Sequence, residues 1–324
     1  MKIKRMNSNP LPPEQNPNQS WERNTLEKLL LQVYKEQRST RIWRWVGRGI
    51  ALLFGLMLLA GLVGGRQDVN KLKGAHTAVI ELNGVIDSAN DNANKLIEGL
   101  EAAYANPNVK GIILRANSPG GSPVISNIAF EEIRRIKAQH KNIPLYVVAE
   151  DVCASGCYYI ASAADKIYAD PSSLVGSIGV ISGGFGFTGL MDKLGIERRL
   201  RTAGENKGMG DPFSPENPEQ EALWNKVLQD THQTFIQAVK TGRGDRLKFE
   251  QNPDVFSGRI YSGTEGKQVG LVDDLGNLYS VSRDVLKAPT LVDYTPKDDF
   301  SKTLGRRFGV QFKQGLQSLS GPGW

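Results

Sequence analysis

The sequence predicts an α/β domain with a mostly parallel sheet, preceded by one membrane-spanning helix. Between residues 74 and 286, short apolar runs alternate with amphipathic stretches, which is typical of such a domain. The composition, 40% hydrophobic and 23% charged over 324 residues, is that of an ordinary globular protein. The membrane segment is predicted by positive charge that is concentrated before one uncharged apolar run.

The excess positive charge lies at the N-terminus. Residues 1–48 hold ten of the 40 Lys/Arg and four of the 34 Asp/Glu, so the other 276 residues hold 30 of each sign. A neutral body argues against nucleic acid as a partner. Two cysteines exclude a disulfide-rich scaffold and a four-cysteine zinc site, and three scattered histidines suggest no metal site. We expect neither a metal nor a cofactor.

The apolar run covers residues 49–65, which as a helix would be about 25 Å long, near the lower limit for crossing a bilayer. Trp43 and Trp45 suit the membrane interface, and the preceding positive charge places residues 1–48 in the cytoplasm. A buried core helix and a cleaved secretory signal are the alternatives. A basic region of 48 residues is long for a secretory signal, so we interpret the run as an uncleaved anchor.

The remaining segments follow in order. Residues 1–48 are expected to be partly disordered, and 66–75 form a linker to the domain at 76–286. Residues 287–324 form a tail. Its apolar residues at 301–320 either line one face of a helix or belong to a frayed terminal helix. Strands are predicted at 76–82, 110–116, 144–149, 166–169 and 196–202, and helices at 91–105, 122–140, 155–164, 185–194 and 215–241.

Two strand ends carry unusual residues, and ligand sites in parallel sheets lie at such ends. The first strand end runs into Asn117-Ser118-Pro119-Gly120-Gly121, a glycine turn that opens a helix and can bind an oxyanion. The second places Ser155 among small residues at a strand-to-helix turn, as nucleophilic serines are placed. In both cases the alternative is an ordinary turn with a serine helix cap.

A nucleophilic serine needs a base. His76, His140 and His232 are not predicted to lie beside either loop, so a lysine is the remaining option. A free lysine has a pKa of about 10.4, and lowering it by about 3 units corresponds to roughly 4 kcal/mol, which desolvation can supply. These arguments do not choose between Lys207, Lys166 and Lys193.

Taken together, these motifs resemble the bacterial signal peptide peptidase SppA family in its shorter, membrane-anchored form. The resemblance covers about residues 76–285 and is carried by NSPGG (117–121), ASG-x-YYIASAADKIYA (154–169), GSIGV (176–180) and the glycine-rich loop around Lys207. It implies a crotonase/ClpP-like α/β fold outside the membrane. It also implies a serine endopeptidase that degrades cleaved signal peptides by an acyl-enzyme mechanism.

By the same resemblance, Ser155 matches the nucleophile, Lys207 the general base and Ser177 the serine that orients the lysine. Gly120 matches an oxyanion-hole donor that acts with the N–H of Ser155, and Gly121 is the less favoured alternative. The family often has Gly-Gly after the serine, where this chain has Gly156-Cys157. We expect the cysteines that flank the serine to be two buried thiols.

The resemblance further implies apolar signal peptides as substrates and a homo-oligomer as the working form. It places the chain in the bacterial inner membrane, with the catalytic domain in the periplasm. Two rival functions remain: an inactive membrane-anchored scaffold on the same fold, and an acyl-CoA-type enzyme. The second is disfavoured, because such an enzyme needs no lysine base and the periplasm supplies no CoA.

Overall fold

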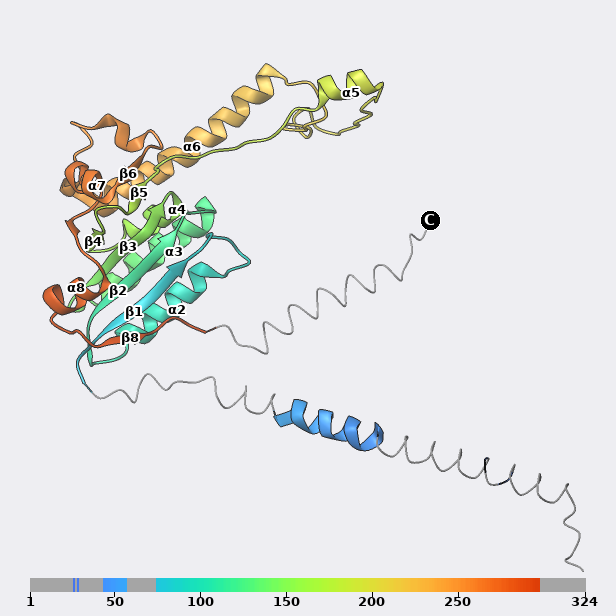
Figure 1. Cartoon of the computed structure of the whole chain (residues 1–324). Helices are drawn as coiled ribbons and strands as arrows, with labels where there is room; N and C mark the ends of the chain where they lie inside the picture. The colour runs from blue at the N-terminus through green and yellow to red at the C-terminus, as the bar shows by residue number, and fades with distance from the viewer. Residues whose placement is uncertain (1–25, 27, 29–42, 57–73, 298–324) are drawn as a thin grey trace, which may run out of the picture. The chain divides into compact units, whose positions relative to one another are not determined.

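The structure is a computed structural model that describes residues 26, 28, 43–56 and 74–297 (Figure 1). The chain divides into two units: residues 1–67 with 299–324, and residues 68–298.

In the first unit, residues 43–56 are helical and mostly exposed. No helix among the described residues is both long and apolar enough to cross a membrane. Residues 57–65 of the predicted membrane segment lie outside the described residues, as do the predicted linker up to residue 73 and the tail at 301–320.

The second unit is built on an eight-stranded sheet. Its main path runs β6-β5-β3-β2-β1-β8, and β4 pairs with β3 and β7 beside this path. Among the described strands every pairing is parallel except β5 with β6, which confirms the predicted sheet type. The strands are β1 (His76–Asn83), β2 (Val109–Ser118), β3 (Leu145–Ala154), β4 (Lys166–Ala169), β5 (Leu174–Gly176), β6 (Ile260–Ser262), β7 (Asp274–Leu275) and β8 (Leu291–Asp293).

Helices connect these strands close to where the sequence predicts them. The α-helices are α2 (Asn92–Tyr104), α3 (Pro123–Gln139), α4 (Gly156–Ala161), α5 (Thr188–Leu194), α6 (Pro218–Arg243), α7 (Gly263–Val269) and α8 (Leu278–Ser280). Short helical turns of other types are η2 (Gly244–Arg246), η3 (Pro253–Phe256) and η4 (Val281–Val285).

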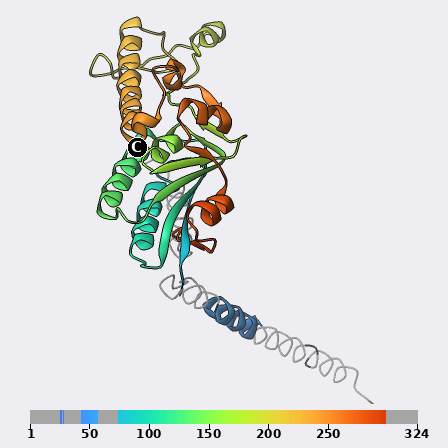
Figure 2. The ribbon, with the colours of Figure 1, turned by 90° about the vertical axis from the view of Figure 1, so that its left-hand side faces the viewer.

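Both faces of the central strands are buried, as is expected for a parallel sheet. Alternate residues along β1 show this: Ile80 and Leu82 belong to the main core, while Val79 belongs to a smaller core on the other face. Figure 2 shows α2 and α3 on one side of the sheet and the segment of α8 and η4 on the other. Ala116 near the end of β2 and Cys153 near the end of β3 belong to the main core, so these ends are held by buried apolar packing.

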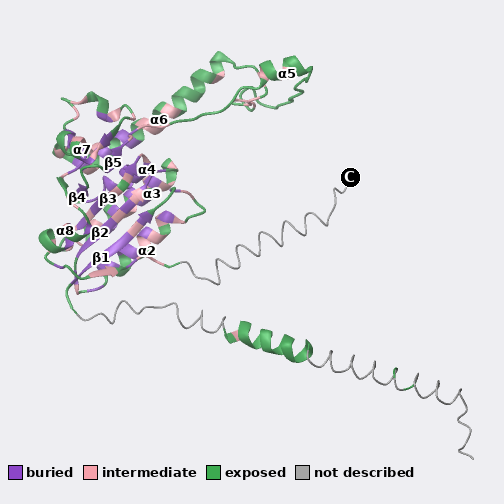
Figure 3. Cartoon of the chain, viewed as in Figure 1, coloured by how far each residue is buried: buried purple, intermediate pink, exposed green. Residues whose placement is uncertain are grey.

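Residues 181–217, which we call the arm, lie apart from this packing. Figure 1 shows the arm, with α5 in it, at the far end of the long helix α6. The arm is mostly exposed, including Ile181 at 96% and Phe185 at 81% (Figure 3). The predicted strand at 196–202 is wrong: this stretch is irregular and lies in the arm, where it has no paired strand.

Candidate active site

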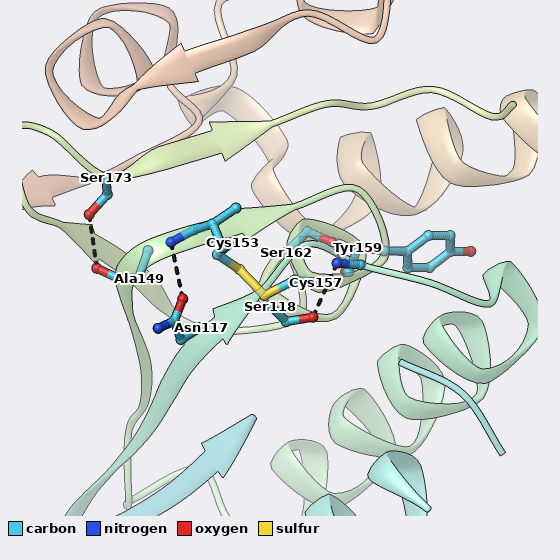
Figure 4. The surroundings of a disulfide bond; sticks show 10 residues. Asn117, Ser118, Ala149, Cys153, Cys157, Tyr159, Ser162 and Ser173 are labelled. Atoms are coloured by element: carbon cyan, nitrogen blue, oxygen red, sulfur yellow. Dashed lines mark hydrogen bonds between the residues drawn. A yellow bond between two sulfur atoms is a disulfide. The ribbon is translucent and has the colours of Figure 1, made fainter. Parts of the chain in front are cut away.

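The two strand ends singled out in the sequence lie side by side. The register pairs Ser118 at the end of β2 with Cys153 near the end of β3. Figure 4 shows the two neighbouring strand ends and the start of α4. Gly120 approaches the second turn so closely that a Cβ at this position would lie 2.6 Å from the amide nitrogen of Gly156 and 2.8 Å from Cβ of Ser155. The glycine turn is therefore required where it stands, because no side chain fits between the loops.

Ser155 lies in the turn between β3 and α4 and is half-buried. Its backbone has φ 53° and ψ −123°, a conformation that costs an L-residue on the order of 1–3 kcal/mol. Its N–H donates to the carbonyl of Gly176 at 2.8 Å, and its own carbonyl accepts from the N–H of Tyr159 at 2.9 Å. Its side chain makes no helix-cap hydrogen bond. An ordinary helix cap therefore does not describe this serine, whereas a strained turn is common at functional sites.

Ser177 is brought next to Ser155. The register pairs Ala154 with Gly176, so the two serines follow directly after a paired position on β3 and β5. Ser177 also has a positive φ, 52°, and its N–H donates to the carbonyl of Arg259 at 2.8 Å. The structure thus groups Ser155, Ser177 and Gly120 at one edge of the sheet.

The predicted oxyanion donors are already engaged. The Ser155 N–H donates to the carbonyl of Gly176, so this donor is occupied in the structure. The Gly120 N–H donates to Oγ of the buried Ser118 at 3.1 Å. Two other backbone amides lie at the same place. One is the amide of Gly156, the first residue of α4. The other is the amide of Gly121, whose nitrogen lies 3.1 Å from the position that a Cβ on Gly156 would take. The first amides of a helix have no partner within the helix, so they are suited to bind an anion.

Lys207 is not brought to this group. It is exposed, lies in the arm, and donates its backbone N–H to Gly204 at 3.1 Å. Among the described residues, no hydrogen bond or ion pair joins Lys207 to Ser155 or Ser177. The contact between Lys207 and Ser155 that the resemblance implies is therefore not formed within this one copy of the chain.

His232 lies closer to the site than the sequence indicated. Its Nε2 is 2.9 Å from the carbonyl oxygen of Ile178, the residue after Ser177. A ring nitrogen bound to a carbonyl must carry the hydrogen, so Nε2 of His232 is a donor here and not a base. Helical spacing alone could not place this residue, because its contact is with a loop 54 positions earlier.

Cys153 and Cys157 form a disulfide, with their Cα atoms 5.1 Å apart (Figure 4). The expectation of two buried thiols is wrong in this respect, although both residues are buried. The turn at Ser155 brings the strand end and the helix start within the range a disulfide needs.

A charged row that the sequence analysis did not single out crosses three neighbouring strands near the site. Arg115 on β2 binds Glu81 on β1 at 3.1 Å and Glu150 on β3 at 2.6 Å. Its hydrogen bond to Glu150 is the main cause that raises the pKa of Arg115 above its usual value. Because all three side chains are about one-third exposed, the row is a partly solvated pairing of charges.

Comparison with known proteins identifies the kind of domain that contains these residues. Residues 137–289 match the model of peptidase family S49, and this range contains Ser155, Ser177 and Lys207. The chain is 35% identical over 193 residues to a putative protease of Methanocaldococcus jannaschii, covering 60% of each protein. It is 30% identical over 214 residues to a putative signal peptide peptidase SppA of Enterococcus faecium, covering 66% of this chain and 61% of that protein.

A further relative is 46% identical over 184 residues, 57% of this chain: a protein of Brucella melitensis named Na(+)/H(+) antiporter NhaA. The match covers only 25% of that protein, and about three fifths of the other two relatives. The antiporter activity in the Brucella protein's name is therefore said of that protein alone. The family model and the two protease relatives agree: residues 137–289 carry a peptidase family S49 domain, similar to that of the SppA-type proteases.

Proposed function

We propose that this chain is a membrane-anchored serine endopeptidase that cleaves apolar peptides, with Ser155 as the nucleophile. The observation that carries the proposal is the strained backbone of Ser155 at a strand-to-helix turn, inside the matched peptidase domain. Ser177 and the amides of Gly121 and Gly156 lie beside this turn. The mostly parallel sheet supports the further inference that the domain has a crotonase/ClpP-like fold.

The proposed reaction is acyl transfer. The Ser155 hydroxyl attacks the peptide carbonyl while a neutral Lys207 accepts its proton, and Ser177 orients the lysine amine. The amides of Gly121 and Gly156 hold the developing oxyanion, with an effect of roughly 3–4 kcal/mol per donor. Lys207 then protonates the leaving amine and activates the water that hydrolyses the acyl-enzyme.

A homo-oligomer is part of this proposal. Lys207 lies on the arm, and the arm exposes apolar side chains that a monomer would leave in water, such as Phe185 and Leu194 at 81% and 63%. We propose that the arm packs against a second copy of the chain and delivers Lys207 to that copy's Ser155. Burial in such an interface would also desolvate the lysine, which a lysine base requires.

The substrates we propose are cleaved signal peptides left in the membrane. The name of the Enterococcus relative supports this class, as does the charge pattern that predicts a cytoplasmic N-terminus and a periplasmic domain. An inactive scaffold remains the second candidate function, favoured by one observation: the residues of the proposed dyad are not in contact within a single copy.

The experiment is cleavage of a fluorogenic signal peptide by the detergent-solubilised full chain. Wild type should cleave it, while Ser155→Ala and Lys207→Ala should each fall to near background. Mixing the two variants during assembly should restore part of the activity, because an intact serine and an intact lysine can then meet at one site. No cleavage of any apolar peptide by assembled wild type would favour the scaffold, and an active Lys207→Ala variant would show that another group is the base.

A further inference from the structure

The disulfide between Cys153 and Cys157 closes a ring of five residues that has Ser155 at its centre. Cys153 is the last residue but one of β3, and Cys157 is the second residue of α4. The bond therefore links the strand and the helix directly across the turn that presents the serine (Figure 4). Both cysteines are buried, with exposed fractions of 1% and 0%.

The turn needs support of this kind. At φ 53° and ψ −123°, Ser155 adopts a conformation that L-residues keep only when their surroundings impose it. One hydrogen bond ties its N–H to Gly176 on β5, and another ties its carbonyl to the N–H of Tyr159 in α4. Neither bond fixes the separation between the strand end and the helix start. The disulfide does, by joining residues whose Cα atoms lie 5.1 Å apart.

The disulfide also lies against the facing loop. Cys153 is in register with Ser118, whose buried hydroxyl accepts the N–H of Gly120. Gly120 in turn has no space for a side chain between itself and Ser155. A change in the path of the chain at Cys153 would therefore move both the serine and the loop that carries the glycine amides.

We propose that the Cys153–Cys157 disulfide is a positioning element that holds Ser155 in its reactive conformation, so that full activity requires the oxidised form. This proposal rests on the proposed role of Ser155 as the nucleophile. A dithiol reductant would convert the cystine to two thiols: the S–S bond breaks, two S–H bonds form, and the dithiol gives up two electrons and two protons as it becomes a disulfide. The freed turn would then leave the strained conformation for part of the time.

The primary test replaces both cysteines by serine, because buried sulfurs meet a reductant only after local opening. Full-length wild type and the Cys153→Ser/Cys157→Ser variant are compared in detergent for peptide cleavage and for the rate at which a small fluorophosphonate labels Ser155. We expect kcat and the labelling rate each to fall about tenfold, with KM changed less than about twofold. Long incubation of wild type with dithiothreitol should lower both rates similarly, reoxidation should restore them, and the double variant should not respond. Thiol alkylation and mass measurement give the redox state.

The outcomes separate this proposal from the proposed function. Equal kcat and labelling rates in wild type and the double variant would overturn the positioning role while Ser155-dependent cleavage still stood. A loss explained entirely by unfolded protein, with normal labelling of the folded fraction, would also overturn it. If oxidised wild type shows neither cleavage nor labelling that depends on Ser155, the proposed function itself fails, and the positioning role fails with it.

Discussion

The amide of Ser155 donates a hydrogen bond of 2.8 Å to the carbonyl of Gly176, across the pairing of β3 with β5. This bond ties the turn of the proposed nucleophile to the strand that leads into Ser177. It also occupies the donor that the sequence suggested for an oxyanion. The neighbouring amide of Gly156, the first of α4, is therefore the donor that we propose for a substrate oxyanion.

Replacing Gly120 by alanine should abolish the close approach of the two loops. Its φ is 98°, and the added Cβ would lie 2.6 Å from the Gly156 nitrogen and 2.8 Å from the Ala154 carbonyl oxygen. Because both contacts are with backbone, the loops must separate, and we expect kcat for peptide cleavage to fall at least about tenfold. Steady-state kinetics on the folded variant measure the effect.

Gly84→Ala is the matched control for this change. Gly84 also has a positive φ, 74°, but an added Cβ would meet nothing within 4 Å. The control should lose about 1–2 kcal/mol of stability from backbone strain alone and keep its kcat. Equal losses of kcat in the two variants would show that positive φ, and not the contact between the loops, explains the result.

Removing the side chain of Arg243 should strongly destabilise the domain. Its guanidinium is fully buried at the end of α6, binds Asp273 at 2.7 Å, and donates twice to the carbonyl of Gly270. Arg243→Ala would leave the Asp273 carboxylate with only the partly exposed Arg246, 3.5 Å away, as its charged partner, at a cost of about 3 kcal/mol, the lower end of the range for a broken buried pair.

Denaturant unfolding measures this cost, and the exposed pair of Arg259 with Glu265 provides the comparison. Both of its side chains are nearly half exposed, so Arg259→Ala should change the free energy of unfolding by less than about 1 kcal/mol. If Arg243→Ala cost no more than Arg259→Ala, the buried pair would not be what fixes this end of α6.

Asp211 should make the arm sensitive to acid. The hydrogen bond from Ser214 at 2.7 Å, together with one from Arg198, holds the pKa of the Asp211 carboxyl below its usual value of 3.8. Because the folded-state pKa is lowered, the stabilising contribution is complete above 3.8 and is lost as the pH falls through the lowered pKa. Hydrogen-exchange protection of the arm should therefore be greater in wild type than in Asp211→Asn at neutral pH, and the difference should disappear as the pH falls through the lowered pKa. A difference that persists at the lowest pH would contradict this assignment.

The four longest strands, β1 to β4, could be predicted from the sequence because local patterns determine them. The apolar run at 166–169 became β4 with the same bounds, and Ser122 caps α3 as its position before Pro123 indicates. The three residues of β5 are too few to show any periodicity. They become a strand only because β3 continues to Ala154 and offers them an edge.

In the site, too, features set by local sequence could be predicted and features set by long-range pairing could not. Ser155 could be found from small residues at a strand-to-helix turn, which is a local pattern. The bond from its amide to Gly176 could not, since it depends on a pairing between segments about 20 residues apart. The disulfide was missed because a spacing of four residues does not give a distance: the left-handed backbone of Ser155 brings the two Cα atoms together. The setting of Lys207 depends on the arm, in which this residue is exposed.

Covalent labelling tests most directly whether Ser155 is the nucleophile. Detergent-solubilised wild type is treated with a fluorophosphonate, digested, and mapped by mass spectrometry. We expect one adduct, on Ser155, that is absent from Ser155→Ala and forms at least about 100-fold more slowly in Lys207→Ala. An adduct on another serine, or active protein that gains no adduct at all, would contradict the assignment of Ser155 as the nucleophile.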